Sequence, residues 1–485
     1  MPLILSGNVA SATADAGYTV ANSCRFNSAD SAYMAITPAG AGSTRKLSFS
    51  CWFKLTELAA TRGGAYNVFH SVYDGTNKWV ISIDDSDKLF IGHYNGSSWD
   101  MLLNSNQVLR DVSAFYSLIV IIDTEEGTDT NRAKVFLNGT QVTSWSTETY
   151  PAEDFDGIWC KDSATEVGRY APASAQYGGF YLAEVVSCDG QTYTTTDFGE
   201  FDEDSPTIWK PIDVSGLTFG TNGFYLDFED SANLGNDANG GTDLTESNLD
   251  ATDQATDTPT NSFATLNPLY LAAASYTIEE GNLQITANAS NAWRSLYGNF
   301  GITSGKWYWE IKFDAINAGD VDNLAVGIVD VEQVVQTSSN GKFFGTSRGY
   351  AYHAKDGKKL TNDTVTANGA DYGDAWTAGD IVGCAVDLDN QKIYWSKNGT
   401  FQDSGDPTTG ATGTGSAFDI GSGYTYLPVA ANYYTAENYS FNFGGCPAFS
   451  ISSGNADADG YGNFEYAVPS GYYALCTKNL GAYGG

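Results

Sequence analysis

Two acidic stretches carry the side chains whose types and spacing suit the binding of a divalent cation. Residues 123–129 contain four carboxylates, and residues 455–466 place oxygen-bearing side chains at their first, third and fifth positions, with glycine at the sixth. Calcium takes roughly six to eight oxygen ligands, mostly from carboxylate, amide and carbonyl groups. The candidate Ca²⁺ ligands are Asp123, Glu125, Glu126, Asp129, Asn455, Asp457 and Asp459.

Each of these stretches also has a structural interpretation. Residues 455–466 partly resemble the loop of an EF-hand, but a bidentate Glu belongs at its twelfth position, where this chain has Tyr466, with Glu465 one place early. No helix is expected on either side. A turn rich in Asp and Gly explains this stretch without calcium, as a solvated hairpin loop explains residues 123–129. The sequence leaves both interpretations open.

Patterns that would indicate catalysis are weak. The three histidines, His70, His93 and His353, lie outside the Gly-x-Ser-x-Gly and His-Glu-x-x-His contexts. A glycosidase needs two carboxylates about 5–10 Å apart, a pair that 58 acidic residues leave open. However, Glu184 is a lone carboxylate on an apolar strand, which favours a structural or edge role. We therefore expect a protein that is not an enzyme, with a glycan depolymerase as the less favoured alternative.

Aromatic side chains near predicted turns are candidates for contact with a ligand, because loops commonly carry binding residues. Core packing is the alternative for each of them, since aromatic rings bury large areas. The candidates are Trp293, Tyr350, Tyr352, His353 and Trp376.

The elements that would position these residues are strands joined by tight turns. Asn-Gly and Asp-Gly, which supply the positive φ angles of two-residue hairpins, recur along the chain between alternating apolar runs, as in AKVFLNGTQV and QKIYWSKNGTF. No stretch has a long amphipathic period of 3.6 residues with caps. We predict an all-β fold of two antiparallel, jelly-roll-like β-sandwich domains joined by an acidic linker rich in Asn, Asp and Gly, with a short C-terminal tail.

A change in composition marks the domain boundary. No Lys or Arg occurs between Lys210 and Arg294, and Asp, Asn, Gly and Thr dominate the middle of that interval. The predicted organisation is an N-terminal segment (1–20), a first sandwich (21–228), an acidic linker or long loop (229–270), a second sandwich (271–446) and a C-terminal tail (447–485).

The charge balance limits the partners. With 58 acidic and 24 basic residues the net charge is −34, which disfavours nucleic acids and anionic membrane surfaces. The start of the chain lacks the features of a signal peptide, and the longest apolar run, Leu118 to Ile122, is far too short to span a membrane. We expect a protein made in a cytoplasm, without membrane insertion, that leaves the cell by lysis or inside a particle.

Four ordered motifs in the second half resemble the SPRY family. They are SGKWYWEIKF (304–313), AVGIVD (325–330), GDIVGCAVDLDNQKIYWSKNG (379–399) and YLPVAANYYTAENYSFNFG (426–444). The resemblance implies a bent antiparallel sandwich that serves for binding and has no catalytic apparatus.

The first half resembles laminin-G or concanavalin A-like sandwiches. The motifs are RKLSFSCWFKLTEL (45–58), AFYSLIVIIDTEEGTDTNRAKVFLNGT (114–140) and GGFYLAEVVSCDGQ (178–191). Such sandwiches often bind sugars beside a Ca²⁺ ion, but their ligand loops vary, so no ligand set is carried over.

Further strings, among them IWKPIDVSG, DQATDTPTNSFATLNPL and PSGYYALCTKNL, resemble bacteriophage structural proteins of the tail-fibre or host-recognition type. This resemblance implies a virion protein, made in the host cytoplasm, that contacts other virion proteins and recognises a host surface glycan or protein, as a homo-oligomer. The alternative is a structural or decoration protein of the capsid or tail, with the C-terminal tail docking on a neighbour.

Overall fold

The computed structural model describes residues 4–5, 17–62, 65–172, 176–270, 276–288, 292–315, 323–335, 341–362 and 369–484. The regular structure of the described chain is mostly strands, which turns and loops connect, with short 3₁₀ helices and one seven-residue α-helix, α1 (Thr477–Tyr483). It forms two compact units. The first unit spans residues 14–260, and the second unit combines residues 261–485 with residues 1–13. The predicted all-β fold class is confirmed.

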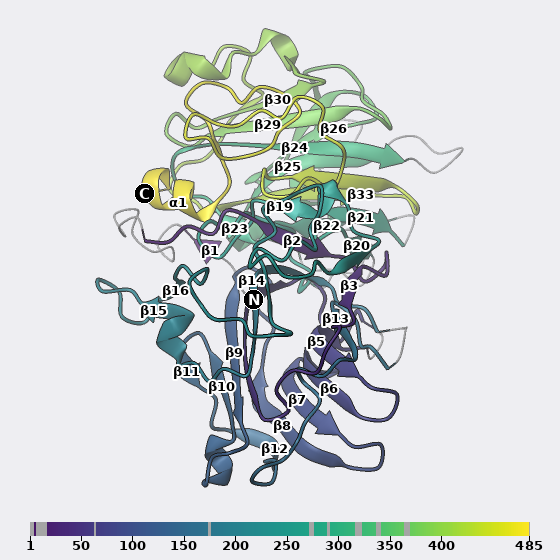
Figure 1. Ribbon diagram of the computed structural model, residues 1–485. Helices are drawn as coiled ribbons and strands as arrows, with labels where there is room; N and C mark the ends of the chain where they lie inside the picture. Colours follow the sequence, from purple (N-terminus) through teal and green to yellow (C-terminus); the bar gives the residue numbers. More distant parts are fainter. Residues whose placement is uncertain are drawn as a thin grey trace. The chain divides into compact units, whose positions relative to one another are not determined.

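The first unit contains two antiparallel sheets (Figure 1). In spatial order, one consists of β11 (Thr140–Gln141), β10 (Ala133–Leu137), β9 (Tyr116–Asp123), β4 (Lys46–Leu55), β14 (Phe180–Asp189), β2 (Ser23–Phe26) and β19 (Gln254–Ala255), with β17 (Phe224–Leu226) beside β14. The other consists of β12 (Trp145–Thr149), β8 (Trp99–Val108), β7 (Lys88–Tyr94), β6 (Lys78–Ile83), β5 (Asn67–Tyr73), β13 (Ala164–Val167), β3 (Tyr33–Ile36) and β18 (Thr245–Ser247). Strands β11 and β12 are thus edge strands of the two sheets.

Alternation along β4 explains how the sheets pack. Phe53 faces the second sheet, where its ring lies 4.5 Å from that of Phe69 on β5. The other face of β4 is buried as well, because the hairpin of β15 (Gly199–Phe201) and β16 (Trp209–Pro211) lies over it, with Trp52 and Trp209 in one buried cluster. Because both faces of β4 are covered, nine of its ten residues are buried, among them the polar Ser48, Ser50 and Lys54.

Residues 229–270, interpreted from the sequence as a linker or a long loop, belong largely to the first unit. Strand β18 pairs with β3 and β19 pairs with β2. Arg25 lies 3.2 Å from Asp253, and Lys54 Nζ lies 2.8 Å from Asp257 Oδ2. Short strand pairings and ion pairs therefore hold a long loop on the sandwich, and the boundary between the units falls at residue 260.

The second unit is also a sandwich. One sheet consists of β20 (Tyr276–Glu279), β21 (Gln284–Ala287), β34 (Asn438–Asn442), β24 (Lys306–Ala315), β29 (Ile381–Asp387), β30 (Lys392–Lys397) and β31 (Thr400–Phe401), with β32 (Phe418–Asp419) beside β30 and β35 (Tyr473–Ala474) parallel to β24. The other consists of β22 (Arg294–Tyr297), β33 (Tyr426–Asn432), β25 (Leu324–Asp330), β26 (Gly349–His353), β27 (Lys358–Thr361) and β28 (Ala370–Asp371). Strands β1 (Ile4–Leu5) and β23 (Phe300–Gly301) form a short parallel pair.

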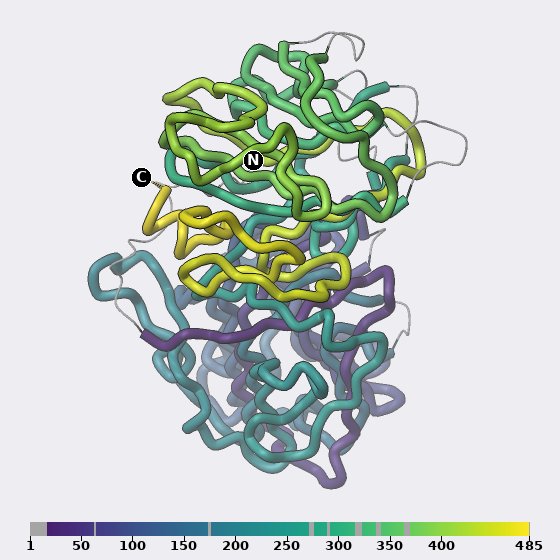
Figure 2. The backbone as a smooth tube through the Cα atoms, turned by 90° about the horizontal axis from the view of Figure 1, so that it is seen from above, coloured from purple at the N-terminus to yellow at the C-terminus, as the bar shows by residue number. Residues whose placement is uncertain are grey.

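The C-terminal segment, residues 447–484, folds back along the strands of the second unit (Figure 2). Phe464 and Tyr472 enter a buried cluster with Tyr308 of β24 and Tyr394 of β30. The buried carboxylate of Glu310 accepts the backbone N–H groups of residues 465 and 466, at 2.9 and 2.8 Å. The predicted tail is therefore part of the core of this unit.

Candidate functional site

A solvent-open pocket of about 350 Å³ lies at one edge of the first unit. Its walls come from the end of β8, the turn between β10 and β11, and residues 142–144, which connect the edge strands β11 and β12. Asn138 and Gly139 have φ angles of +48° and +73°, as a two-residue Asn-Gly hairpin turn requires. The volume is near the lower end of the roughly 300–1,000 Å³ that is usual for small-ligand sites.

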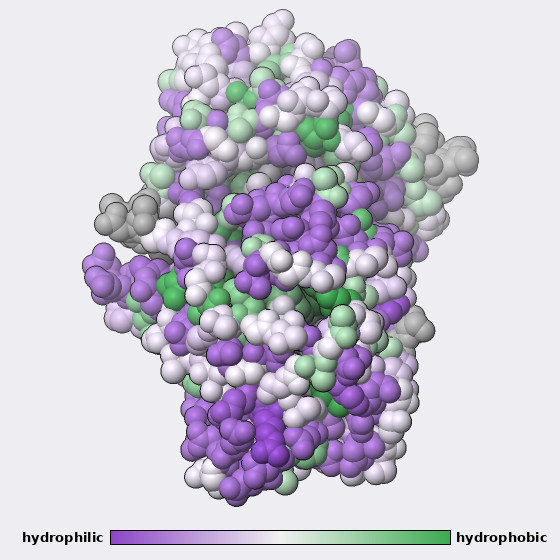
Figure 3. Space-filling model, viewed as in Figure 1, coloured by the Kyte–Doolittle hydropathy of each residue, from purple (hydrophilic) through white to green (hydrophobic). Residues whose placement is uncertain are grey.

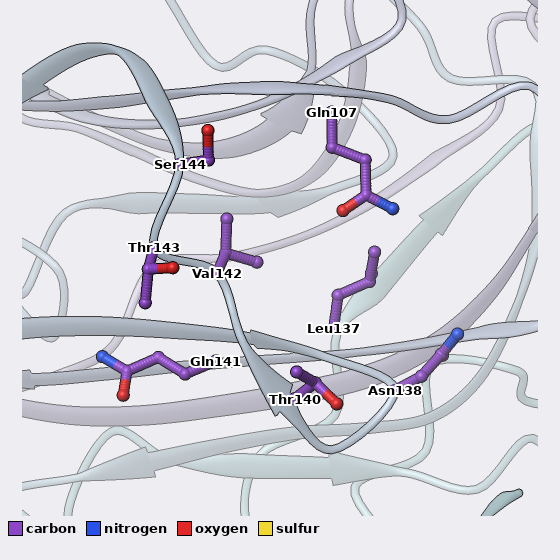
Figure 4. A pocket seen from close by; sticks show the side chains of 8 residues that line it. All are labelled: Gln107, Leu137, Asn138, Thr140, Gln141, Val142, Thr143 and Ser144. Atoms are coloured by element: carbon purple, nitrogen blue, oxygen red, sulfur yellow. The ribbon is translucent and has the colours of Figure 1, made fainter. Parts of the chain in front are cut away.

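The lining of this pocket is mostly polar and carries no charge. It consists of Gln107, Leu137, Asn138, Thr140, Gln141, Val142, Thr143 and Ser144. Figure 4 shows the side chain of Gln107 across the pocket from Leu137 and Val142, whereas the amide of Gln141 points away from them. Amides and hydroxyls donate and accept hydrogen bonds but do not titrate near neutral pH. The pocket therefore offers binding contacts and no general acid or base.

The fold uses only part of this polar lining. Oδ1 of Asn138 accepts a hydrogen bond from the backbone N–H of Ser117 (2.8 Å), and Oγ of Ser144 accepts one from Nδ2 of Asn106 (3.0 Å). Four other side chains make no hydrogen bond to any residue that the structure describes: Gln107, Thr140, Gln141 and Thr143. Their donors and acceptors are available to a ligand.

In the first predicted calcium stretch, the ammonium group of Lys46 pairs with two of the four carboxylates. Nζ of Lys46 lies 3.6 Å from Asp123 Oδ2 and 2.9 Å from Glu125 Oε2, and its hydrogen bond lowers the pKa of Glu125. Glu126 and Asp129 are exposed at the loop surface.

In the second predicted calcium stretch, the side-chain oxygen atoms accept hydrogen bonds from other residues of the C-terminal segment. Oδ1 of Asp457 accepts the backbone N–H of Asp459 (3.0 Å), and Oδ2 accepts Nδ2 of Asn479 (2.8 Å). Asn455 forms a backbone bridge with Phe464. Across the described ranges, no group of three or more acidic, histidine or cysteine side chains has an arrangement that could hold a metal ion. Five of the seven candidate ligands have internal hydrogen-bond or ion-pair partners: Asp123, Glu125, Asn455, Asp457 and Asp459. The other two, Glu126 and Asp129, remain exposed at the loop surface.

The five side chains predicted to contact a ligand lie in the core of the second unit. Trp293, Tyr350, Tyr352, His353 and Trp376 are all at most 7% exposed. The ring of Trp293 lies 6.0 Å from that of His353, and the ring of Tyr352 lies 5.9 Å from that of Trp376. Three of them, Tyr350, Tyr352 and His353, are in the buried strand β26. Core packing, the alternative given above, explains all five, because aromatic rings bury large areas.

A buried carboxylate of the first unit has unusual surroundings. Glu184 of β14 has a φ of +49°, in the left-handed region, at a bulge where the register with β4 shifts between Ala183 and Val186. The hydroxyl groups of Tyr225 and Tyr18 donate to its Oε2 at 2.8 and 3.3 Å. Burial raises the pKa of Glu184 to about 7. These contacts agree with the structural role expected from the sequence.

Glu184 should make the stability of the first unit depend on pH. Between the unfolded pKa of 4.5 and the folded pKa of about 7, the folded chain keeps a proton that the unfolded chain has lost. Stability is therefore fully present below pH 4.5 and falls as the pH rises to about 7, by about 3 kcal/mol in all. Glu184→Gln should remove this fall from the unfolding free energy measured between pH 4.5 and 8. Glu437→Gln, which replaces a buried carboxylate of the second unit whose pKa burial also raises to about 7, is the control. If the unfolding free energy of Glu184→Gln fell with pH as steeply as that of the wild type, the pH dependence could not be assigned to Glu184.

Comparison with known proteins gives matches for both units. A model described as the SPRY domain matches residues 306–445, and one described as the concanavalin A-like lectin/glucanases superfamily matches residues 27–185. The chain is 28% identical over 155 residues to E3 ubiquitin-protein ligase RKP of Arabidopsis thaliana, covering 32% of this chain and 10% of that protein. It is 29% identical over 96 residues to Ran-binding protein 9 of Danio rerio, covering 20% and 14%. The chain thus spans only a small part of these relatives.

Solved structures that match parts of the chain include the SPRY domain of human HERC1, with 19% identity, a TM-score of 0.26, and coverage of 36% of this chain and 94% of that one. A heptameric SAP-like pentraxin from Limulus polyphemus has 13% identity, a TM-score of 0.26, and coverage of 34% and 72%. Among the described residues, no helix is long and apolar enough to cross a membrane.

Proposed function

Because the chain joins a concanavalin A-like domain to a SPRY domain, we propose that it is a bacteriophage virion protein that recognises the host surface. It is a tail-fibre-like, receptor-binding adhesin that binds a glycan or protein through its sandwich loops and catalyses no reaction. Both domains are of types that typically bind other molecules. The resemblance of strings along the chain to phage structural proteins is the ground for proposing a phage origin. Several copies on one particle raise the avidity of a weak single site.

The observation that carries this proposal is the pocket at β11 and β12. Four of its amide and hydroxyl side chains lie at the surface and make no hydrogen bond to any described residue. The buried carboxylates of Glu184 and Glu310, in contrast, accept internal hydrogen bonds. None of the eight lining residues is ionisable at neutral pH. This combination suits recognition of a ligand and does not suit acid–base chemistry.

The test is binding of the purified chain to a panel of bacterial cells and to their purified envelope polysaccharides, with and without EDTA. We expect saturable binding to at least one cell type that EDTA does not change, because internal contacts occupy the acidic loops. We also expect no release of reducing sugar. Absence of binding to every cell type, or release of reducing sugar, would overturn the proposed function. Loss of binding in EDTA would indicate that binding needs a divalent cation such as Ca²⁺.

A second candidate function, contact with other virion proteins, is favoured by the β15–β16 hairpin. It projects from the side of the first sandwich, and the turn at its end is strongly hydrophilic (Figures 1 and 3). Phe201, the last residue of β15, and Ile208, in the turn just before β16, are 42% and 37% exposed. They are two of the three large apolar side chains exposed among the described residues. Trp209, paired with Phe201 next to the turn, anchors the hairpin, because its Nε1 donates to Ser117 Oγ at 3.2 Å. A rigid hairpin with exposed apolar side chains suits docking on another protein.

If this hairpin docks, the double variant Phe201→Ser/Ile208→Ser should lower incorporation into phage particles about tenfold, as the loss of two buried contacts predicts. The measurement is the amount of the chain in purified particles. Val108→Ser, which changes the third exposed apolar side chain (39%), should leave incorporation unchanged. Equal incorporation of all three forms would remove the support for a structural role.

A further inference from the structure

We propose that the β15–β16 hairpin docks on the turn between β26 and β27 of a second copy of this chain. This inference rests on the docking role proposed above for the hairpin and names its partner. The evidence is a match of charge and of apolar surface between the acidic turn (residues 202–208) and the lysine turn (residues 354–359), which lie in different units. Each copy offers one turn and receives the other, so the contact is heterologous and builds rings or filaments.

The acidic turn is ordered from within and presents both charge and apolar surface. Oδ1 of Asp202 accepts the backbone N–H groups of residues 204 and 205 at 3.0 and 2.9 Å. Glu203 and Asp204 are exposed and make no ion pair with any residue that the structure describes. They lie in the chain between Phe201 and Ile208, the exposed apolar side chains of the hairpin. A partner must therefore offer cations beside an apolar surface, since burial of unpaired carboxylates is costly.

The lysine turn brings three ammonium groups together. Lys355 is exposed, Lys358 and Lys359 are half-buried, and none of the three makes an ion pair with a described residue. The one carboxylate within the turn, Asp356, is engaged by His353, whose Nδ1 lies 2.7 Å from its Oδ1. The three cations are therefore available to carboxylates from outside.

An apolar patch adjoins the lysine turn. Nζ of Lys359 lies 5.7 Å from the ring centre of Tyr372 and 5.5 Å from that of Phe418. Phe418 is only half-buried, so part of its ring can pack against Phe201 of another copy. Exposed ion pairs contribute little affinity, whereas opposite charges speed the encounter and exclude wrong partners. We therefore expect the apolar contact to hold the copies together and the charges to select the surface.

The charge distribution of the chain is what points to this turn of a second copy. With 58 acidic residues, most of the surface repels an acidic turn. Most basic side chains are already paired with carboxylates of their own chain. At the lysine turn, even Asp371, the register partner of Lys358 on β28, forms no ion pair with it. This turn thus meets the requirement that the acidic turn sets.

The test is sedimentation velocity of the full chain and of two charge-reversed variants. Glu203→Lys/Asp204→Lys reverses the acidic turn, and Lys355→Glu/Lys358→Glu reverses the lysine turn. We expect the wild type to self-associate as its concentration rises, and each variant alone to associate at least about tenfold more weakly, because like charges then meet at the contact. An equimolar mixture of the two variants should associate again, since every turn then finds a turn of opposite charge. Restored association would also show that both variants are folded.

The control is Glu126→Lys/Asp129→Lys, which changes the net charge equally at exposed residues of another loop and should associate like the wild type. A wild type that stays monomeric up to about 100 μM, variants that associate like the wild type, or a mixture that stays dissociated would each overturn the inference. If the wild type is monomeric but its incorporation into particles depends on Phe201 and Ile208, the hairpin docks on another virion protein instead. Self-association without binding to any cell would support the inference and defeat the adhesin.

Discussion

Phe464→Ala should lower the free energy of unfolding of the second unit by about 3–5 kcal/mol, the usual cost of truncating a fully buried Phe. The side chain of Phe464 has no exposed surface, and its ring lies 5.2 Å from that of Tyr308 in an edge-on arrangement. It shares its cluster with Tyr394 and Tyr472. Calorimetry should show the loss as a lower melting temperature for the transition of the second unit, with the first unit unaffected.

The matched control is Phe201→Ala, which truncates a Phe that is 42% exposed and should change stability by no more than about 0.5 kcal/mol. Equal melting temperatures for Phe464→Ala and the wild type would show that the C-terminal segment is not part of the core. By the same reasoning, a chain that ends at Cys446 should lose the cooperative transition of the second unit, since the deletion leaves the buried carboxylate of Glu310 without two of its donors. Such a truncation therefore does not test docking of a tail on a neighbouring protein.

Much of the fold could be predicted from the sequence because it depends on local patterns. Asn-Gly turns and alternation fix hairpins such as β10–β11 and β30–β31 within a few residues of chain. The two family resemblances, to concanavalin A-like and SPRY domains, are confirmed in the predicted order. The two long stretches around residues 229–260 and 447–484 were harder. Their strands are two or three residues long and exist only through pairing with distant strands, which no local pattern reveals.

The candidate binding sites could be predicted less well than the fold, and the physical reason differs for the aromatic side chains, the acidic loops and the pocket. A ring such as Trp293 is near a turn in the sequence, but a turn can bury its neighbours as well as expose them. Asp123 and Asp457 have the right chemistry for calcium, yet Lys46 and Asn479, far away in the sequence, occupy their oxygens. The pocket combines Gln107 with residues 137–144, and neutral polar side chains give no signal until the sheet edges bring them together.

Asp257→Asn should lower the free energy of unfolding of the first unit by about 3–5 kcal/mol, because it removes the carboxylate charge that faces the buried ammonium group of Lys54. The two side chains are 1% and 2% exposed, and Nζ of Lys54 lies 2.8 Å from Oδ2 of Asp257 and 5.9 Å from the ring centre of Tyr181. The pair fastens the long loop that follows β19 to the middle of the first sheet. The loss should appear in urea denaturation of the first unit.

Two further variants separate the ion pair from simple loss of packing. Lys54→Met/Asp257→Leu replaces both charges with apolar groups and should regain most of the stability lost in Asp257→Asn, because no buried charge is left unpaired. Asp154→Asn breaks the exposed pair in which Arg45 Nη1 lies 2.7 Å from Asp154 Oδ1, and should cost no more than about 1 kcal/mol. If Asp257→Asn costs as little as Asp154→Asn, the ammonium group of Lys54 must reach water in solution, and the loop after β19 must be held by its strand pairing alone.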